Sequence, residues 1–424
     1  MNSIMLRSKP KDWQAVKLGQ YFEERNEKVS DEDYPALSVT YNGIVPQMEH
    51  VAKSNDRDNR KRVAVGDFVI NSRSDRRGAS GLSDYDGSVS LISLVLKPRL
   101  GHGRFLHYLL KSIAFQEEFY RYGHGIVADL WTTRYSELKN IFVALPDGRT
   151  QTQIAEFLDQ RCARIGRLIT KKQQLITFLK QKEHIAIDGS LTCHLKKREP
   201  LQETGLPWIP TIPAHWKLQR AKFLFRNVIR APLDDDKIIT AFRDGQVTLR
   251  ENRRTEGYTF AVKEVGYQHI EKGDLVIHTM DAFAGAIGVS DSSGKSTGEY
   301  AVCEAITDNV NNQYYAQVLR CMAERNYIYV LCPSVRERAP RFRFSKFAPV
   351  YLPLPPKPEQ DEIAEFLQKS RVLRDKTHMS LTLLKRYRAS LINETVTGQL
   401  DIEQFADASA ADIRLDQIEK EMAQ

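Results

Sequence analysis

The side chains in this sequence with the clearest chemical purpose are arginines that gather in short polar segments. The first half of the chain holds two groups: Arg57, Arg60, Lys61 and Arg62, then Arg73, Arg76 and Arg77. The second half holds two more: Arg243, Arg250, Arg253 and Arg254, then Arg336, Arg338, Arg341 and Arg343. A planar guanidinium group can form paired hydrogen bonds with a phosphate or with the major-groove edge of guanine. One such segment alone is more often a solvated loop, but their occurrence in both halves favours a polyanionic partner.

Polar residues beside these groups could supply further contacts to bases or to a nucleic-acid backbone. They include Tyr41, Asn42, Gln47, Asn71 and Ser72. Where the first half reads NSR at residues 71–73, the aligned second half reads HTM at residues 278–280, although the glycines that follow are retained. A common framework with dissimilar side chains is expected of two readers of different base sequences. The predicted DNA-binding residues are Tyr41, Asn42, Arg57, Arg60, Lys61, Arg62, Asn71, Arg73, Arg76, Arg77, Arg243, Arg250, Arg253, Arg254, Met280, Arg336, Arg338 and Arg341.

Patterns that would indicate catalysis or metal binding are missing from the sequence. Gly288 and the run Gly294-Lys295-Ser296 resemble a phosphate-binding P-loop, but five residues separate the glycines where that motif requires four. The ten histidines and five cysteines form no HExxH, no CxxC and no mixed cluster at metal-ligand spacing, and scattered cysteines indicate reduced thiols. The NPP[YF] tetrapeptide of an adenine methyltransferase does not occur either. We therefore predict that the chain catalyses nothing and binds no metal or cofactor itself.

The elements that position the arginine groups are encoded twice. The five letters IAEFL begin at Ile154 and return at Ile363. A second correspondence aligns residues 78–84 with residues 285–291, and Trp13 is matched by Trp216. A tandem duplication of this length gives one chain the pseudo-twofold geometry of a dimer, which suits a DNA ligand with two related sites.

Each copy ends in a long amphipathic helical pattern. From about residue 150 to 186, and again from about 359 to 397, apolar residues recur at spacings of three, four and seven without a proline. Helices of about 35 residues would be roughly 50 Å long. Because charged residues interrupt the heptad seams, we expect an intramolecular antiparallel pair or a partner groove rather than a homodimeric coiled coil. The predicted partner-binding residues are Ile154, Leu158, Ile165, Leu175, Ile363, Leu367, Leu384 and Leu391.

The predicted fold class is α+β, with two β-rich domains at opposite ends of the two long antiparallel helices. Short apolar runs broken by Gly, Asp and Asn turns make the remaining blocks strand-rich. The expected domains are a recognition domain at residues 1–148, a spacer helix and linker at 149–205, a second recognition domain at 206–355, and a second spacer helix with a tail at 356–424. The proline-rich stretch 200–216 is expected to be an extended linker.

Composition agrees with a nucleic-acid partner. Lysine and arginine outnumber aspartate and glutamate by 62 to 54, which gives a net charge of +8 over 424 residues and an isoelectric point near 9.0. No leader-like apolar stretch follows the charged N-terminus, and no uncharged run approaches the roughly 20 residues that span a bilayer. We therefore expect a cytoplasmic protein without a membrane segment.

These features together resemble the DNA-specificity subunit of a type I restriction-modification system. The resemblance is carried by the duplication of the whole chain and by GDFVINSR at residues 66–73 with its counterpart GDLVIHTM at 273–280. It is also carried by LWTTRYSELK at residues 130–139, before the closing proline, and by the paired IAEFL helix starts. It extends over nearly the whole sequence.

The resemblance implies a non-catalytic subunit that takes part in DNA methylation and phage defence. Two target-recognition domains would each read half of a bipartite, asymmetric DNA sequence, and two spacer helices would dock the other subunits. The implied partners are double-stranded DNA, two methyltransferase subunits and two restriction subunits that translocate DNA. S-adenosylmethionine, ATP and Mg would be bound by those partners and not by this chain. The alternatives are a specificity subunit of a related type IIB-like system and a freestanding DNA-binding regulator.

Overall fold

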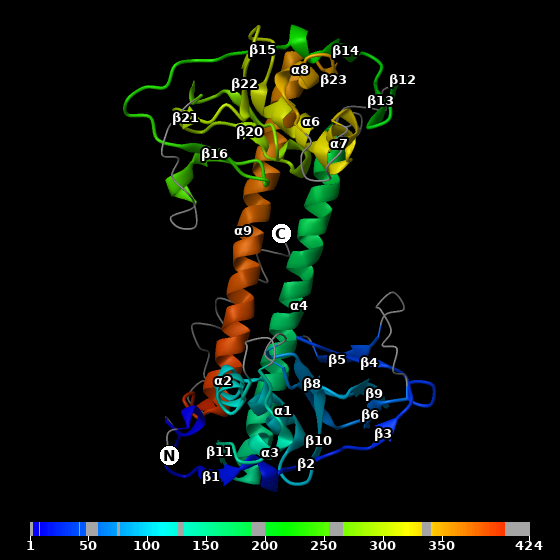
Figure 1. The fold of residues 1–424 in the computed structure, drawn as a ribbon, viewed down its shortest axis with the longest axis vertical. Coiled ribbons are helices and arrows are strands. Elements are labelled where there is room, and N and C mark those ends of the chain that lie inside the picture. Colours follow the sequence, from blue (N-terminus) through cyan, green and yellow to red (C-terminus); the bar gives the residue numbers. More distant parts are fainter. Residues whose placement is uncertain are drawn as a thin grey trace. The chain divides into compact units, whose positions relative to one another are not determined.

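The chain folds into two compact units, seen in the computed structural model of Figure 1. The structure describes residues 3–7, 9–41, 43–47, 58–73, 77–125, 131–187, 200–253, 266–332 and 341–402. The first unit comprises residues 1–173 and 379–424, and the second unit comprises residues 174–378. Both units therefore contain residues from both halves of the duplicated sequence.

Two helices of 40 residues each, α4 (Gly148–Ile187) and α9 (Lys357–Val396), contribute residues to both units. At 1.5 Å per residue each helix is about 60 Å long. Both begin just after the prolines that follow the preceding strands. In the second unit the two helices are in contact, because Glu183 of α4 accepts hydrogen bonds from Ser370 (2.7 Å) and Arg374 (2.5 Å) of α9. In the first unit Asn393 of α9 accepts a hydrogen bond from the backbone N–H of Ala114 (2.8 Å).

The strands of the first unit form antiparallel sheets around a small apolar core. A four-stranded sheet has the order β2-β10-β7-β8, with β2 (Phe22–Glu24), β10 (Ser93–Pro98), β7 (Phe68–Asn71) and β8 (Ser80–Leu82). A three-stranded sheet comprises β3 (Lys28–Val29), β6 (Arg60–Val63) and β9 (Gly87–Ser90). The remaining pairs are the hairpin β4 (Leu37–Thr40) with β5 (Gly43–Pro46), and β1 (Gln14–Lys17) with β11 (Phe142–Leu145). Val63, Val69, Val89 and Val95 are fully buried between these sheets.

The second unit repeats this topology. Its four-stranded sheet has the order β15-β22-β19-β20, with β15 (Phe225–Asn227), β22 (Tyr300–Ala305), β19 (Leu275–His278) and β20 (Ile287–Val289). Further pairs are β18 (Gln268–Ile270) with β21 (Gly294–Ser296), β16 (Ile239–Ala241) with β17 (Val247–Leu249), and β14 (Lys217–Arg220) with β23 (Tyr351–Leu354). The duplication inferred from the sequence therefore extends to the strand order. The run Gly294-Lys295-Ser296 forms strand β21 and is not a phosphate-binding loop before a helix.

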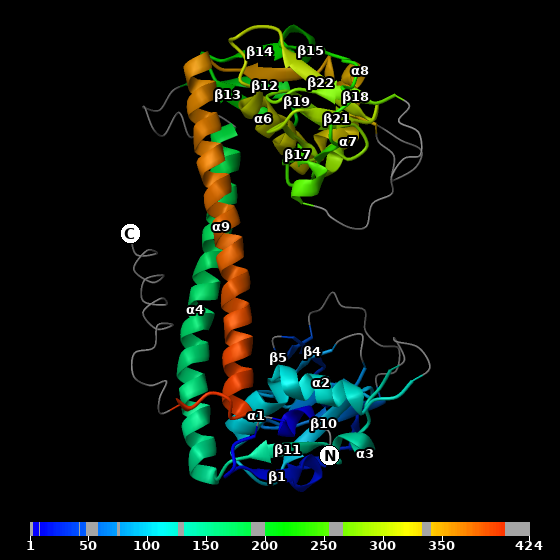
Figure 2. The same cartoon turned by 90° about the vertical axis from the view of Figure 1, so that its left-hand side faces the viewer.

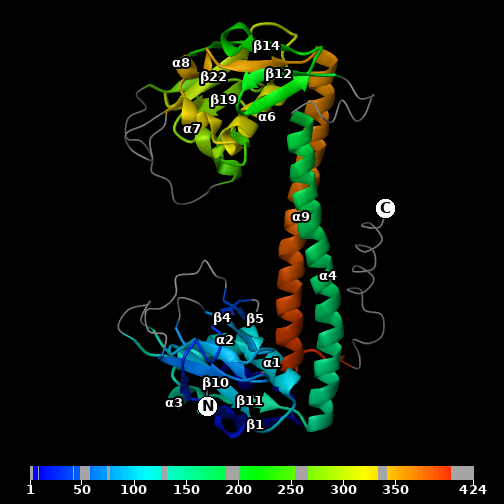
Figure 3. The ribbon, with the colours of Figure 1, turned by 90° about the vertical axis from the view of Figure 1, so that its right-hand side faces the viewer.

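Short helices pack against each sheet (Figures 2 and 3). They are α1 (Gly103–Lys111), α2 (Ile113–Arg121) and α3 (Tyr135–Leu138) in the first unit, and α6 (Asn312–Glu324), α7 (Tyr327–Leu331) and α8 (Phe344–Phe347) in the second. Single-turn 3-10 helices are η1 (Ile4–Leu6), η2 (Leu18–Gln20), η5 (Ala221–Phe223), η6 (Arg250–Asn252) and η7 (Ala282–Ala284). Ser112 separates α1 from α2. The chain breaks at Ser112, whose extended backbone lets its side chain cap α2 by accepting from the N–H of Phe115.

The proline-rich stretch after residue 200 differs from its prediction. The extended linker expected there is instead the antiparallel hairpin of β12 (Leu201–Leu206) and β13 (Ile209–Pro213). Trp208 and Ile212 of this segment are buried in the same core as Ile363 and Leu367 of α9.

Candidate nucleic-acid interface

The end of strand β7 presents one of the predicted arginines to solvent on a fixed backbone. The N–H of Ser72 donates to the carbonyl of Ile92 (3.3 Å), and the carbonyl of Ser72 accepts from the N–H of Thr133 (3.1 Å). The side chain of Asn71 accepts from the N–H of Arg73 (2.9 Å). Asn71 and Ser72 are buried, whereas Arg73 is exposed. The two buried residues therefore hold the strand end, and the arginine is free to contact a ligand.

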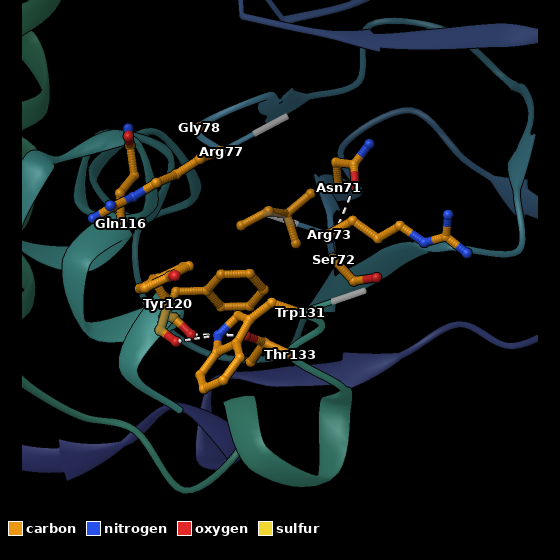
Figure 4. Close-up of a pocket in the computed structure, with 11 residues that line it drawn as sticks. Asn71, Ser72, Arg73, Arg77, Gly78, Gln116, Tyr120, Trp131 and Thr133 are labelled. Carbon is orange, nitrogen blue, oxygen red and sulfur yellow. Dashed lines mark hydrogen bonds between the residues drawn. The ribbon is translucent and has the colours of Figure 1, made fainter. Parts of the chain in front are cut away.

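Aromatic side chains adjoin this strand end (Figure 4). The guanidinium of Arg77 lies 4.8 Å from the ring centroid of Tyr120 and pairs with Glu117. Trp131 lies beside Tyr120, with ring centroids 5.6 Å apart, and its indole N–H donates to the Tyr120 carbonyl (2.9 Å). The cavity between them has a volume of about 20 Å³, which is room for one water molecule. The site is therefore a surface of cationic and aromatic groups rather than a pocket for a small ligand.

The end of strand β19 has the same backbone contacts in the second unit. The N–H of Thr279 donates to the carbonyl of Glu299 (2.9 Å), and the carbonyl of Thr279 accepts from the N–H of Phe342 (2.9 Å). The side chains differ, because His278 and partly buried Met280 stand where the first unit has Asn71 and Arg73. Burial lowers the pKa of His278 from its usual value. One backbone arrangement thus carries two different sets of side chains.

Two exposed arginines near hairpin β16–β17 pair with carboxylates: Arg243 lies in its turn, and Arg253 follows η6. Arg243 contacts Asp281 at 2.9 Å, and Arg253 contacts Asp244 at 2.6 Å while its guanidinium lies 4.3 Å from the ring centroid of Phe242. Such exposed pairs contribute about 0 to 1 kcal/mol to stability. A phosphate could therefore replace the carboxylates at little cost.

Two further predicted arginines of the second unit lie near these turns. Arg341 is exposed and pairs with Glu299 at 3.3 Å, beside the end of β19. Arg250 is partly buried, and its side chain donates to the hydroxyl of Thr240 (3.4 Å). Arg341 is thus better placed than Arg250 to reach an external ligand.

The predicted group on β6 is largely occupied inside the first unit. Arg60 is buried and donates to the hydroxyl (2.8 Å) and carbonyl (3.0 Å) of Ser88, and burial lowers its pKa. Lys61 is buried and pairs with Glu24 at 2.9 Å. Arg62 is more exposed and contacts Glu27 at 3.2 Å. The predicted residues that lie outside the described part of the chain are Asn42, Arg57, Arg76, Arg254, Arg336 and Arg338.

The glycines shared by the two copies allow a hairpin to approach the four-stranded sheet. A Cβ built on Gly81 of β8 would lie 2.8 Å from the Cα of Gly43, at the end of the β4–β5 turn. A Cβ on Gly288 of β20 would overlap the carbonyl oxygen of Gly245, in the β16–β17 turn. The first turn carries Tyr41, whose side chain is 63% exposed. Gly81 and Gly288 therefore each allow a turn with candidate DNA-contacting residues to lie close to a four-stranded sheet.

The predicted partner-binding residues are mostly buried within the chain itself. Ile154, Leu158, Ile165, Ile363, Leu367, Leu384 and Leu391 are at most 5% exposed, and Leu175 is partly buried. Large apolar side chains that are exposed on the long helices are Phe178, Val372, Leu373, Met379 and Leu383. These five residues are more accessible to another protein than the predicted set.

Within the described ranges, no three His, Cys, Asp or Glu side chains converge as metal ligands. Among the helices in that part of the chain, none combines the length and apolarity needed to cross a membrane.

Comparison with solved structures identifies the fold. A chain from a study of complex assembly and conformational transition of the type I R-M system aligns with a TM-score of 0.58 and 14% identity, covering 93% of this chain and 100% of that one. The type I restriction-modification system S subunit from M. genitalium aligns with a TM-score of 0.53 and 13% identity, covering 93% and 99%. No protein-family model and no curated protein sequence matches. The chain has the fold of type I restriction-modification specificity subunits, which confirms the resemblance seen in the sequence.

Proposed function

We propose that this chain is a non-catalytic DNA-specificity subunit that recognises a bipartite, asymmetric target. The observation that carries the proposal is the pair of strand ends at β7 and β19. Their backbones make the same two hydrogen bonds, but one presents Arg73 and the other presents Met280. Two similar frames with different side chains would read two different half-sites.

The proposed arrangement keeps the domains expected from the sequence. Residues 1–148 and 206–355 are the two target-recognition domains, and residues 149–205 and 356–424 supply the spacer helices, the linker and the tail. We propose that α4 and α9 run antiparallel, with the recognition domains at opposite ends. The contacts of Glu183 with Ser370 and Arg374 support the pairing of the helices.

The proposed partners are double-stranded DNA, two methyltransferase subunits and two restriction subunits. S-adenosylmethionine, ATP and Mg would belong to those partners. Exposed apolar residues of α9 are candidate contacts for a protein subunit, because large exposed apolar side chains can mark an interface. They are Val372 and Leu373 in the second unit and Met379 and Leu383 in the first. The similarity to a chain from a study of type I R-M complex assembly supports the proposed association with other subunits.

Selection from a pool of randomised duplex DNA tests the proposal and identifies the target at the same time. The full chain should be expressed alone and together with methyltransferase and restriction subunits of a type I system from the same host. We expect sequencing of the bound duplexes to give two unrelated half-sites separated by a spacer of fixed length. A single half-site, a palindrome or no enrichment would contradict the proposal. Tight specific binding by the chain alone, with no stable complex formed on co-expression, would favour a freestanding regulator.

A further inference from the structure

Lys111, the last residue of α1, connects two segments that are far apart in sequence. Its ammonium group donates to the carbonyl oxygens of Tyr41 (3.0 Å), Ser80 (2.9 Å) and Gly78 (3.4 Å). Tyr41 lies in the β4–β5 turn, whereas Gly78 and Ser80 connect the exposed Arg77 to β8. An ammonium group has three N–H donors, so three carbonyl oxygens satisfy it completely. Lys111 thus holds two segments against α1: the β4–β5 turn that carries Tyr41, and the segment that follows Arg77.

Arg320 occupies the corresponding place in the second unit. It lies on α6, which contacts β20 as α1 contacts β8, and these strands hold the same position in their sheets. Its guanidinium lies against the β16–β17 turn, because a Cβ built on Gly245 would overlap Nη1 of Arg320. Gly245 also has a φ of +85°, which disfavours any side chain at that position. The β4–β5 turn and the β16–β17 turn therefore each lie against a cationic side chain. The two cations occupy corresponding positions on α1 and α6.

Lys111 and Arg320 are shielded from water, unlike exposed cations that bind phosphate. Burial, followed by repulsion from Arg388 of α9, lowers the pKa of Lys111 to about 8. Burial, followed by repulsion from Arg371 of α9, lowers the pKa of Arg320 to about 10. Nη1 of Arg320 is buried without a hydrogen-bond partner among the described residues. Because shielding a charge from water costs free energy, these side chains are placed to act within the protein.

We propose that Lys111 and Arg320 are positioning residues that set the placement of the two turns and so the base preference of each unit. The inference rests on the proposed function. Neither cation touches DNA itself. Lys111 fixes the turn that presents Tyr41, and Arg320 fixes the turn that presents Arg243. If a turn moves by even 1 Å, its side chains no longer meet the base edges in hydrogen-bonding geometry.

The test uses Lys111→Met and Arg320→Met in the full chain, each selected against randomised duplex DNA. Methionine keeps most of the apolar stem of either side chain but removes every donor and the charge. We expect Lys111→Met to reduce enrichment of the preferred bases about tenfold at one half-site only, within the range for one lost base contact. Arg320→Met should do the same at the other half-site. The unaffected half-site is an internal control for folding, and Lys97→Met and Lys272→Met are controls for loss of an exposed lysine in each unit.

Two readouts separate positioning from other roles. The dependence of affinity on salt should stay unchanged, because a lost phosphate contact would reduce the slope by about one. Without DNA, hydrogen exchange of the amides at residues 37–46 should accelerate in Lys111→Met and not in Lys97→Met. If Lys111→Met fails to fold, Arg320→Met still decides, since its removal leaves no carbonyl without a donor.

Several outcomes would overturn the inference. They are unchanged base preference at both half-sites, equal loss at both, or a reduced salt slope with base preference retained. If the unmodified chain selects no two-part target, the proposed function fails. In that case unchanged hydrogen exchange in the variants would reject the anchoring of the turns as well, and accelerated exchange would support it.

Discussion

Mild acid should destabilise the first unit through His107, which lies on α1. The N–H of Leu82 donates to its Nδ1 (3.3 Å), and its ring packs edge-on against Phe68 and Tyr108, with centroids 6.1 and 5.3 Å away. Burial, followed by the nearby charges of Arg104 and Lys111, lowers the pKa of His107 from 6.5 to about 4. Protonation of Nδ1 would also replace the acceptor for Leu82 with a second donor.

The magnitude follows from the difference in pKa between the folded and unfolded chain. Above pH 6.5 His107 is neutral in both states and stability does not depend on it. As the pH falls below 6.5, His107 becomes protonated in the unfolded chain but stays neutral in the folded chain. The free energy of unfolding therefore decreases until pH 4. One pKa unit is about 1.4 kcal/mol, so the loss is about 2 kcal/mol at pH 5 and at most about 3 kcal/mol at pH 4.

The matched variant for this prediction is His107→Asn, because an asparagine Oδ1 can accept from Leu82 as Nδ1 does but does not titrate. Its smaller volume should cost a constant amount at every pH. We would measure urea unfolding of the full chain at pH 7.5, 6 and 5, following each unit by pulsed hydrogen exchange. The second unit has Ala316 at the aligned position, so the part of the acid dependence that His107→Asn removes should be confined to the first unit. Equal loss of stability with falling pH in the unmodified chain and in His107→Asn would refute the reasoning.

Three further predictions concern DNA recognition, the stability of the second unit, and the spacing of the half-sites. Replacing Arg73 with Ala should weaken one half-site by about 1 to 3 kcal/mol and Arg253→Ala the other, in binding assays with the selected duplex; equal loss on all sequences would indicate phosphate contacts instead. Gly288→Ala should destabilise the second unit by about 1 to 3 kcal/mol in urea, because its Cβ would overlap the facing turn, whereas Gly148→Ala, where a Cβ meets nothing, should not. Insertion of one heptad after Leu175 should change the spacer length in the selected target without altering the half-sites. Selection of the original spacer would show that the helices do not set it.

Local sequence predicted the long helices well and the arginine sites less well. The start of α4 was predictable because a proline precedes an uninterrupted apolar period, and that signal depends only on neighbouring residues. The role of Lys61 was not predictable, because its partner Glu24 is brought to it by the pairing of β6 with β3 and the packing of the sheets. Trp131 and Tyr120 were missed for the same reason, since only the fold places them beside Arg77.

Because the chain is duplicated, comparing its two units can separate residues that maintain the fold, the frame, from residues that would contact bases, the readers. Positions that perform the same physical task in both units belong to the frame, as Gly81 and Gly288 do, since each lets a turn approach its sheet. Positions that share a backbone but not a side chain, such as Arg73 and Met280, are where the two target sequences can differ. Lys111 and Arg320 differ in residue type, so letter-by-letter comparison would place them among the readers. Their shielded charge and their common position beneath a turn place them in the frame instead, and this makes the half-site lost in each variant a test of that assignment.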